Sequence, residues 1–357
     1  DYAHDHFATY VERTMTDIHI RRSGHVGRIT LQRPDALNAM TYNMCQEIDA
    51  ALKTWVDDSS VKCVLIDALG NRAFCAGGDI ADLYATGKAG DYEYGQTFWA
   101  EEYRTNALIA EYPKPYVALI QGFTMGGGVG ISCHGSHRIV GESSQIAMPE
   151  CGIGLVPDVG GSHILAQAPG ALGAYIGLTS HRMSASDAIH VGFADYFIPE
   201  AKWPTLITAL EDSGDVSIIK SFSEAAPRGT LQEEEEQINA IFATSDLSEI
   251  VRRLTQSAHP FGEKALKAMV RNSPLSMACT LEILDRLRET KGDLRAALTL
   301  EYRFTARAME HGDFLEGIRA AIIDKDRMPQ WKHNIMAVPK ADIETMCAPL
   351  GALELTF

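Results

Sequence analysis

The sequence predicts an α/β protein with a helical C-terminal region. Before residue 220, short runs rich in β-branched residues alternate with segments whose apolar residues recur at helical spacing. Beyond about residue 245 the β-branched runs disappear and only the helical spacing continues. The chain has 357 residues, and at about 100–200 residues per domain this length suggests two domains. We therefore expect an α/β core over residues 1–220 and a helical region over residues 221–357, with a boundary near 215–245.

The N-terminal part contains four runs typical of strands, at residues 26–32 (VGRITLQ), 61–68 (VKCVLIDA), 116–121 (YVALIQ) and 138–141 (RIVG). Residues 41–57 and 98–111 lie between them and carry the apolar spacing of amphipathic helices. Alternation of this kind favours a sheet whose faces are largely covered by helices. It resembles a repeated β-β-α unit, although no strict sequence period is present.

The C-terminal part shows four helical segments, at residues 247–258, 261–272, 275–290 and 293–311. The first begins with Asp246 followed by Glu249 three residues later, a signal for an N-terminal cap in which the Asp oxygen accepts from a free backbone amide. The run of four glutamates at 233–236 is typical of a solvated helix face or a linker.

The composition excludes several classes of protein. With 46% hydrophobic and 22% charged residues, the chain is neither disordered nor fibrous. Its formal net charge of −15 disfavours nonspecific binding to nucleic acid or to anionic membranes. No apolar run approaches the ~18 residues that a membrane span requires. We therefore expect neither nucleic acid nor a membrane among its partners.

The N-terminal residues and the cysteines indicate the cellular compartment in which the protein is expected. The first 15 residues lack the apolar stretch of a signal peptide and the Arg/Ser bias of a transit peptide, although a presequence already removed would leave no trace. The seven cysteines are scattered without a C-x-x-C pair, which predicts free, buried thiols in a reducing compartment. This is consistent with the cytoplasm for a bacterial chain or the mitochondrial matrix for a eukaryotic one.

Two glycine-rich turns are the first candidates for chemistry. Residues 72–80 (RAFCAGGDI) follow a strand and precede an expected helix, and residues 122–130 (GFTMGGGVG) do the same. Each alone is explained by tight packing or by a strand-to-helix turn. Together they expose backbone amides that can form an oxyanion hole for a thioester carbonyl. Neither matches a dinucleotide or phosphate-loop fingerprint.

A third segment, residues 147–161 (AMPECGIGLVPDVGG), places Glu150 and Asp158 eight residues apart among apolar neighbours. A carboxylate in apolar surroundings has a raised pKa and can act as an acid or a base. Both residues are otherwise explained as turn or capping carboxylates.

The ordered motifs RPDALNAM, AFCAGGDI, GFTMGGGVG and PECGIGLVPDVGG resemble the crotonase, or enoyl-CoA hydratase/isomerase, superfamily over residues 15–215. The resemblance implies a crotonase-type β-β-α spiral core and an acyl-CoA substrate. It assigns the oxyanion-hole amides to Gly78 and Gly127. Backbone along 35–38 and 76–80 would line the CoA site, which makes Ala36, Ala76, Asp79 and Ile80 candidate substrate contacts.

Departures from the hydratase pattern point to a subfamily. Hydratases carry a catalytic Glu two residues after the glycine triplet, where this chain has Gly130. Glu150 matches the second hydratase Glu, and Asp158 stands where hydratases usually have Gly. This pattern, with EYRFTARAMEHGDFLEGIRAAIIDKDRMPQW at residues 301–331, resembles the 3-hydroxyisobutyryl-CoA hydrolases of valine catabolism. The same resemblance makes Glu102 a further candidate substrate contact.

The resemblance therefore implies a thioester hydrolase with no metal and no cofactor beyond the CoA of its substrate. Glu150 would activate water or attack directly, and Asp158 would hold the 3-hydroxyl, position the water or tune Glu150. Two alternatives stay open: an enoyl-CoA hydratase or isomerase, and a noncatalytic acyl-CoA-binding protein. The oligomeric state is also open, because crotonases are commonly trimers or hexamers but this C-terminal half differs, so a homo-oligomer is one expectation.

Other polar residues are explained by structural roles or by a position beside the expected pocket. His134 and His137 lack a third ligand at metal spacing, so packing or capping is expected for them. The cluster Asp324–Asp326 is expected to be a solvated turn or to shape the site entrance. Arg33 and Arg72 lie beside the expected pocket, and the sequence does not say whether either reaches a CoA phosphate.

Overall fold

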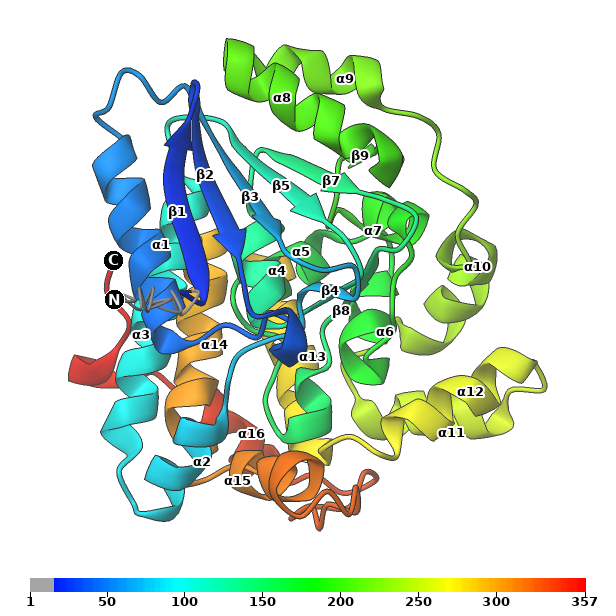
Figure 1. Cartoon of the computed structure of the whole chain (residues 1–357). Helices are drawn as coiled ribbons and strands as arrows, with labels where there is room; N and C mark the ends of the chain where they lie inside the picture. The colour runs from blue at the N-terminus through cyan, green and yellow to red at the C-terminus, as the bar shows by residue number, and fades with distance from the viewer. Residues whose placement is uncertain (1–15) are drawn as a thin grey trace, which may run out of the picture.

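The computed structural model describes residues 16–357, so the expectations on residues 1–15 lie outside the described chain. Within it the strands form two sheets (Figure 1). The six-stranded sheet has the order β1 (Ile18–Ser23), β2 (Val26–Leu31), β3 (Cys63–Ala68), β5 (Tyr116–Ile120), β7 (His137–Val140), β9 (Tyr196–Phe197). A three-stranded sheet has the order β4 (Ala73–Cys75), β6 (Phe123–Met125), β8 (Gln145–Ala147).

The large sheet is covered on both faces, as its strands require. Only the β1–β2 pair is antiparallel; the other neighbouring pairs of this sheet are parallel. Side chains alternate along each strand: Val64 and Ile66 of β3 enter the main core, while Cys63 and Leu65 pack toward α8 (Trp203–Ser213). Both sets are buried, which is why these strands read as continuous apolar runs.

The helices of the N-terminal part pack around these sheets. The first three, α1, α2 and α3, lie before β5; α4 follows β6, and α5 to α9 follow β8. Their bounds are α1 (Tyr42–Trp55), α2 (Ala81–Lys88), α3 (Tyr92–Ala110), α4 (Gly127–Ser132), α5 (Gly161–Gln167), α6 (Leu172–Thr179), α7 (Ala185–Val191), α8 (Trp203–Ser213) and α9 (Ile219–Phe222). Short 3-10 turns add η1 (Pro34–Ala36), η2 (Glu150–Ile153), η3 (Glu200–Lys202) and η4 (Val216–Ile218).

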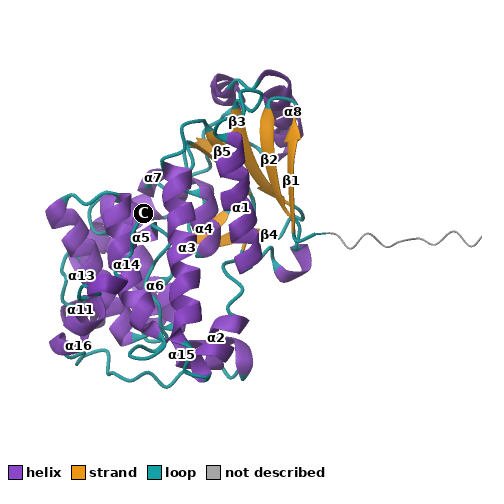
Figure 2. Ribbon diagram, turned by 90° about the vertical axis from the view of Figure 1, so that its left-hand side faces the viewer, coloured by secondary structure: helices purple, strands orange, loops and turns teal. Residues whose placement is uncertain are grey.

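The region after residue 230 is helical, and its helices gather on the side of the molecule opposite the large sheet (Figure 2). Its elements are α10 (Leu231–Phe242), α11 (Leu247–Gln256), α12 (Pro260–Met269), α13 (Pro274–Thr290), α14 (Leu294–Ala308), α15 (Phe314–Ile318), the π-helical turn η5 (Arg319–Ile323), α16 (Lys340–Cys347) and η6 (Gly351–Leu353). One apolar cluster runs from Ile18 to Leu355 and so includes residues on both sides of the expected boundary. The boundary itself stays a prediction.

The predicted elements are largely confirmed. The four expected strands correspond to β2, β3, β5 and β7, and the four C-terminal segments to α11 through α14. Asp246 caps α11 by accepting from the amides of Ser248 and Glu249. The glutamates of residues 233–236 lie on α10. None of the helices between residues 16 and 357 combines the length and the apolar character needed to cross a bilayer.

Sequence patterns missed the small sheet, β1 and the short helices between residues 161 and 213, whereas the helix expected at the glycine triplet is α4. Each strand of the small sheet has three residues, too few for an alternating pattern to stand out. Its strands are parallel, so their carboxyl ends meet at one edge. The segments that follow them there are the two glycine turns and Glu150.

Candidate active site

A cavity of about 250 Å³ lies where these three segments meet. It brings together seven of the nine predicted site residues: Ala76, Gly78, Ile80, Glu102, Gly127, Glu150 and Asp158. Its other walls are mostly apolar and include Phe98 and Trp99 of α3, with Phe314 and Ile322 from the C-terminal region. The site is therefore built from both parts of the chain.

The first glycine turn is fastened by Asn38. Its side-chain oxygen accepts from the amide of Arg33 at 2.8 Å, and its Nδ2 donates to the carbonyls of Leu69 and Ala73 at 2.9 Å each. Asn38 has φ +54°, a left-handed conformation that Asn tolerates better than most residues. Asn38 thereby fixes the residues that follow it. Among them is Met40, whose backbone pairs with the first glycine turn.

Met40 leaves the Gly78 amide free. The Met40 amide donates to the Gly77 carbonyl at 2.8 Å, and the Asp79 amide donates to the Met40 carbonyl at 2.8 Å. Within the described chain, the Gly78 amide donates no hydrogen bond. It borders the cavity with its donor unused.

The second glycine turn supplies the other amide. Gly126 has φ +49° and ψ −118°, which a residue with a Cβ rarely adopts. It caps α4 and makes Gly127 the first helical residue, whose amide also finds no acceptor within residues 16–357. A Cβ placed on Gly127 would lie 3.6 Å from the Gly78 nitrogen. Two free amides thus lie close together at the cavity, as an oxyanion hole requires.

Glu150 follows the third short strand and opens η2. Its side chain is 4% exposed, and neither carboxyl oxygen has a hydrogen-bond partner within the described residues. A Cβ on Gly126 would lie 3.0 Å from its Oε1, so the carboxyl sits beside the oxyanion-hole turn. Burial and the neighbouring Asp158 raise the pKa of Glu150 well above its ordinary value. An unpaired carboxyl of raised basicity beside two free amides can take a proton from a bound water.

Asp158 lies across the cavity on a tight turn that precedes α5. The Tyr103 hydroxyl donates to its Oδ2 at 2.6 Å, and the Gly161 amide donates to its carbonyl at 2.7 Å. Burial raises the pKa of Asp158 to about 6, while the Tyr103 hydrogen bond opposes that rise. The Tyr103 hydrogen bond therefore favours the ionised form of Asp158.

Two further buried acids face these residues. Glu102 of α3 is 4% exposed, and its Oε1 lies 3.2 Å from the position of a Cβ on Gly127. Glu301 of α14 is fully buried. Burial, with Asp158 as a like charge, raises the pKa of Glu102 well above its ordinary value and that of Glu301 to about 8. The site thus concentrates negative charge in a place that water does not screen.

The position at which hydratases carry the Glu after the glycine triplet is closed in this chain. A Cβ on Gly130 would lie 2.6 Å from Nδ2 of Asn106 and 2.8 Å from Cβ of Val159. Contacts this short leave no space for any side chain at residue 130, and certainly none for a glutamate. The carboxyl groups on the cavity wall therefore come from Glu150, Asp158 and Glu102.

Two predicted contacts, Ala36 and Asp79, do not line the cavity. Ala36 lies on the exposed turn η1, and the Asp79 carboxylate pairs with Arg33 at 3.2 Å. Arg33 also donates to the Ala39 carbonyl, so much of its hydrogen-bonding capacity is used. Their role as CoA contacts stays a prediction.

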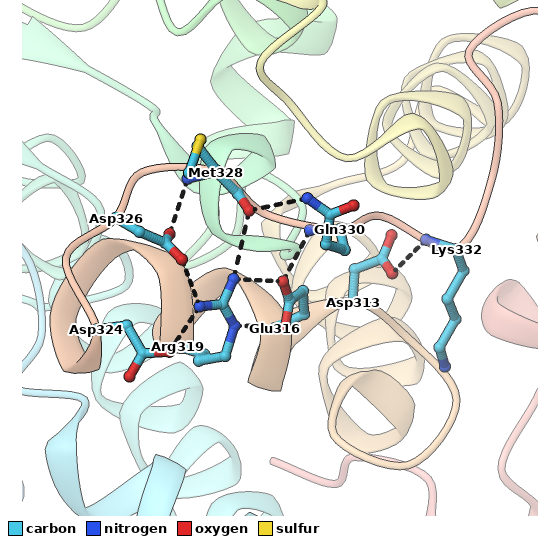
Figure 3. A network of polar contacts seen from close by, with 8 residues as sticks. All are labelled: Asp313, Glu316, Arg319, Asp324, Asp326, Met328, Gln330 and Lys332. Atoms are coloured by element: carbon cyan, nitrogen blue, oxygen red, sulfur yellow. Dashed lines mark hydrogen bonds and ion pairs between the residues drawn. The ribbon is translucent and has the colours of Figure 1, made fainter.

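The cluster Asp324–Asp326 organises a wall of the site. Arg319 binds Asp324 at 2.6 Å, Asp326 at 2.7 Å and Glu316 at 2.8 Å, which ties the end of η5 back onto α15 (Figure 3). The turn η5 carries Ile322 into the cavity lining. The two aspartates thus shape the pocket wall through Arg319.

The two histidines have structural partners. His134 donates from Nε2 to the Val159 carbonyl at 2.7 Å, because a carbonyl can only accept, and burial lowers the pKa of His134 to about 4. His137 contacts the Ser136 hydroxyl and stacks on Tyr196. All seven cysteines are free and buried, as the sequence predicts.

Tyr103, Phe314, Ile322 and Glu301 are site residues that sequence reasoning did not single out. Tyr103 adjoins Glu102 in AEEYRTN, and the other three fall within the motif at residues 301–331. The motif was informative about the subfamily, but nothing in its spacing indicates which of its residues reach the cavity.

Two free amides, buried carboxylates and an apolar cavity together define a crotonase-type acyl-thioester site. The enoyl-CoA hydratase/isomerase family model matches residues 26–347. The chain belongs to this family.

Curated relatives and a solved structure match nearly the whole chain. The chain is 38% identical to "3-hydroxyisobutyryl-CoA hydrolase, mitochondrial" of Gallus gallus, covering 95% of this chain and 90% of that protein. It is 40% identical to the Danio rerio protein of the same name, covering 90% and 86%. A crystal structure described as an enoyl-CoA hydratase from Rhodobacter sphaeroides is 57% identical, covers 96% of this chain and 100% of its own, and superposes with a TM-score of 0.93.

We expect Asn38→Ala to destabilise the protein by about 2–4 kcal/mol, because it orphans buried backbone groups that Asn38 now satisfies. Urea unfolding of the purified variant measures this directly. As a control, Asn43→Ala removes an exposed side chain that contacts only Glu47 and should change stability by less than about 0.5 kcal/mol. Equal stability of the two variants would contradict the anchoring role of Asn38.

The raised pKa of Glu102 predicts a pH-dependent stability difference. Because the folded state holds this proton at pH values where the unfolded chain releases it, stability from this group is full below about pH 4.5 and is lost as pH rises toward its folded pKa. Wild type should therefore lose stability relative to Glu102→Gln between pH 5 and 8, by up to about 1.4 kcal/mol per pH unit. Urea titrations of both proteins across this range test it; a constant difference would show that Glu102 keeps an ordinary pKa.

Proposed function

We propose that this protein hydrolyses a short 3-hydroxyacyl-CoA thioester, 3-hydroxyisobutyryl-CoA, to 3-hydroxyisobutyrate and CoA, a reaction of valine catabolism. One observation carries the proposal: Glu150 stands unpaired beside the oxyanion-hole amides, while Asn106 and Val159 close the position that a second hydratase carboxylate needs. The curated relatives named for this hydrolase support the same reaction.

The geometry supports a direct route to thioester cleavage. The thioester carbonyl oxygen accepts from the Gly78 and Gly127 amides, which stabilise the negative charge that develops when the carbonyl is attacked. Glu150 removes a proton from a water molecule, and the water oxygen bonds to the carbonyl carbon. The carbon–sulfur bond then breaks, the CoA thiolate leaves and takes up the proton that Glu150 removed from water, and the acid is released.

The remaining side chains orient the acyl group. Asp158, held by the Tyr103 hydroxyl, accepts a hydrogen bond from the substrate's 3-hydroxyl. Glu102 faces the oxyanion-hole turn from α3 and contacts the substrate from that side. Phe98 and Trp99 form the apolar wall that excludes bulk water. In this proposal the reaction takes no cofactor beyond the CoA of the substrate.

Enoyl-CoA hydration is the second candidate, and the description of the 57% identical crystal structure favours it. Hydration delivers a hydroxyl and a proton to adjacent carbons, which hydratases of this family achieve with two placed carboxylates. Here Glu150 matches one of them and Gly130 replaces the other, with Asn106 packed against it. Hydrolysis of the thioester needs only one base beside the oxyanion hole, so it fits the observed set better.

The setting of the reaction is also part of the proposal. The relatives are mitochondrial by name, and we propose the mitochondrial matrix for a eukaryotic chain and the cytoplasm for a bacterial one. A homo-oligomer is proposed from the family resemblance alone.

Replacing Glu150 with Gln should lower kcat for 3-hydroxyisobutyryl-CoA by about 10²–10⁴-fold, because an amide cannot take the water's proton. Thiol release followed with a thiol-reactive dye measures the rate. Glu142→Gln, which changes a surface glutamate bonded to the Glu200 amide, is the matched control and should keep wild-type activity.

Crotonyl-CoA, tracked by absorbance in parallel, separates the candidate functions. We expect wild type to leave it unchanged while releasing thiol from the 3-hydroxy thioester. Loss of crotonyl absorbance without thiol release would assign the protein to the hydratases. Binding of both thioesters without turnover would favour the noncatalytic alternative.

A single turnover in H₂¹⁸O distinguishes the two possible roles of Glu150. As a general base, Glu150 directs the label into the product acid and stays unlabelled. As a nucleophile it forms a mixed anhydride, and attack of water on the Glu150 carbonyl leaves the label in the protein. We expect the first result, because the buried, unpaired carboxyl is suited to holding a water; mass spectrometry of the peptide containing Glu150 provides the measurement.

A further inference from the structure

The turn that carries Asp158 has a backbone conformation its own sequence disfavours. Val159, directly after Asp158, has φ +52°. For a β-branched residue the left-handed region is a true outlier, because the branched Cβ crowds the backbone. Gly160 follows with φ +78°, which glycine adopts freely. Contacts from outside the turn must therefore hold Val159 in place.

Glu301 provides most of those contacts from α14, 141 residues away in the chain. Its Oε2 accepts from the Gly160 amide at 2.9 Å. Its Oε1 accepts from the Ser162 amide at 3.1 Å and from the Ser162 hydroxyl at 2.5 Å. Gly160 has no side chain to cap α5, so Glu301 satisfies the free amides of this helix start in its place.

His134 also stabilises the turn, through its hydrogen bond to the Val159 carbonyl. Glu301 is 0% exposed, and burying a carboxyl is unfavourable unless hydrogen bonds compensate it. Both of its oxygens are directed at the turn and neither lines the cavity, so the group is placed to hold backbone rather than substrate.

We propose that Glu301 is a positioning residue for the hydrolysis reaction, which fixes the Asp158 turn from the C-terminal helical region. This inference rests on the proposed function for its catalytic part. Glu301 never touches the thioester; it acts by keeping the Val159 conformation, and thereby the Asp158 carboxylate, in the orientation that meets the substrate's 3-hydroxyl. The long C-terminal region thus contributes to the site's geometry as well as to its wall.

The test variant is Glu301→Gln, which keeps the size of the side chain. The NH₂ group of Gln cannot accept a hydrogen bond. An N–H would therefore face the amide of Gly160 or Ser162, and one of the hydrogen bonds that hold the turn would be lost. We expect kcat/KM for 3-hydroxyisobutyryl-CoA to fall by about 10²-fold, the loss typical of a small misplacement in a catalytic site. Glu310→Gln, an exposed glutamate near the end of α14, is the matched control and should match wild type.

A double-mutant cycle separates positioning from general damage. If Glu301 acts through Asp158, then Glu301→Gln should change kcat/KM by no more than about twofold in an Asp158→Asn background. Discrimination between 3-hydroxyisobutyryl-CoA and isobutyryl-CoA should also fall, whereas a smaller folded fraction would lower both rates equally. The proposal would be overturned if the effects of the two substitutions on kcat/KM were fully additive and the discrimination between the two thioesters were unchanged. Wild-type kinetics of Glu301→Gln would also overturn it.

Hydrogen exchange gives a readout independent of activity. In the unliganded protein, the amides of Gly160 and Ser162 should exchange faster in Glu301→Gln than in wild type, while α1 exchanges alike in both. Ser162→Ala removes only the hydroxyl contact and should leave both amides protected. If wild type releases no thiol, the proposed reaction is wrong, but the exchange comparison still decides whether Glu301 holds the turn. Unchanged exchange of the Gly160 and Ser162 amides in Glu301→Gln would show that it does not.

Discussion

The close approach of two glycine turns is the constraint on which the site depends. A Cβ on Gly128 would lie 2.3 Å from the Cys75 carbonyl oxygen, and Gly126 has a backbone conformation open only to glycine. Any side chain here would push α4 away from the first turn and separate the amides of Gly78 and Gly127. The small sheet enforces the same geometry, because its parallel strands deliver both turns and Glu150 to one edge.

The second determinant is the burial of several acids around one small cavity. Removing carboxyls from water raises their pKa values, and each ionised neighbour raises the others further. This arrangement opposes stability near neutral pH, since it concentrates like charges in a medium of low dielectric. It also makes the carboxylate form of Glu150 a stronger base than a surface glutamate, which is the property that the proposed reaction uses. Tyr103 offsets part of the cost in stability by donating to Asp158.

Much of this molecule was predictable from its sequence, because strong local signals coincide with the elements that matter. Continuous β-branched runs identified the buried strands, and the glycine triplet identified a turn with free amides. Glu150 and Asp158 stood out as carboxylates among apolar residues. The three-residue strands carry no such pattern, and Glu301 acts across 141 residues, a distance that local spacing cannot reveal. Asp79 lies one residue beyond Gly78, yet its side chain turns to Arg33 at the surface.

The joining of both chain parts at the cavity has a consequence for biosynthesis. Met346, Cys347 and Leu355 belong to the same apolar cluster as β1, and Arg104 of α3 binds the carbonyl of Thr356. Before α14, α15 and α16 have been translated, the nascent N-terminal part lacks the surface that covers α3 and the groups that complete the cavity wall. Contacts this distant in sequence close slowly. The emerging chain therefore exposes this apolar surface until α14, α15 and α16 have been synthesised, and the cavity wall stays incomplete until α15 and η5 are present.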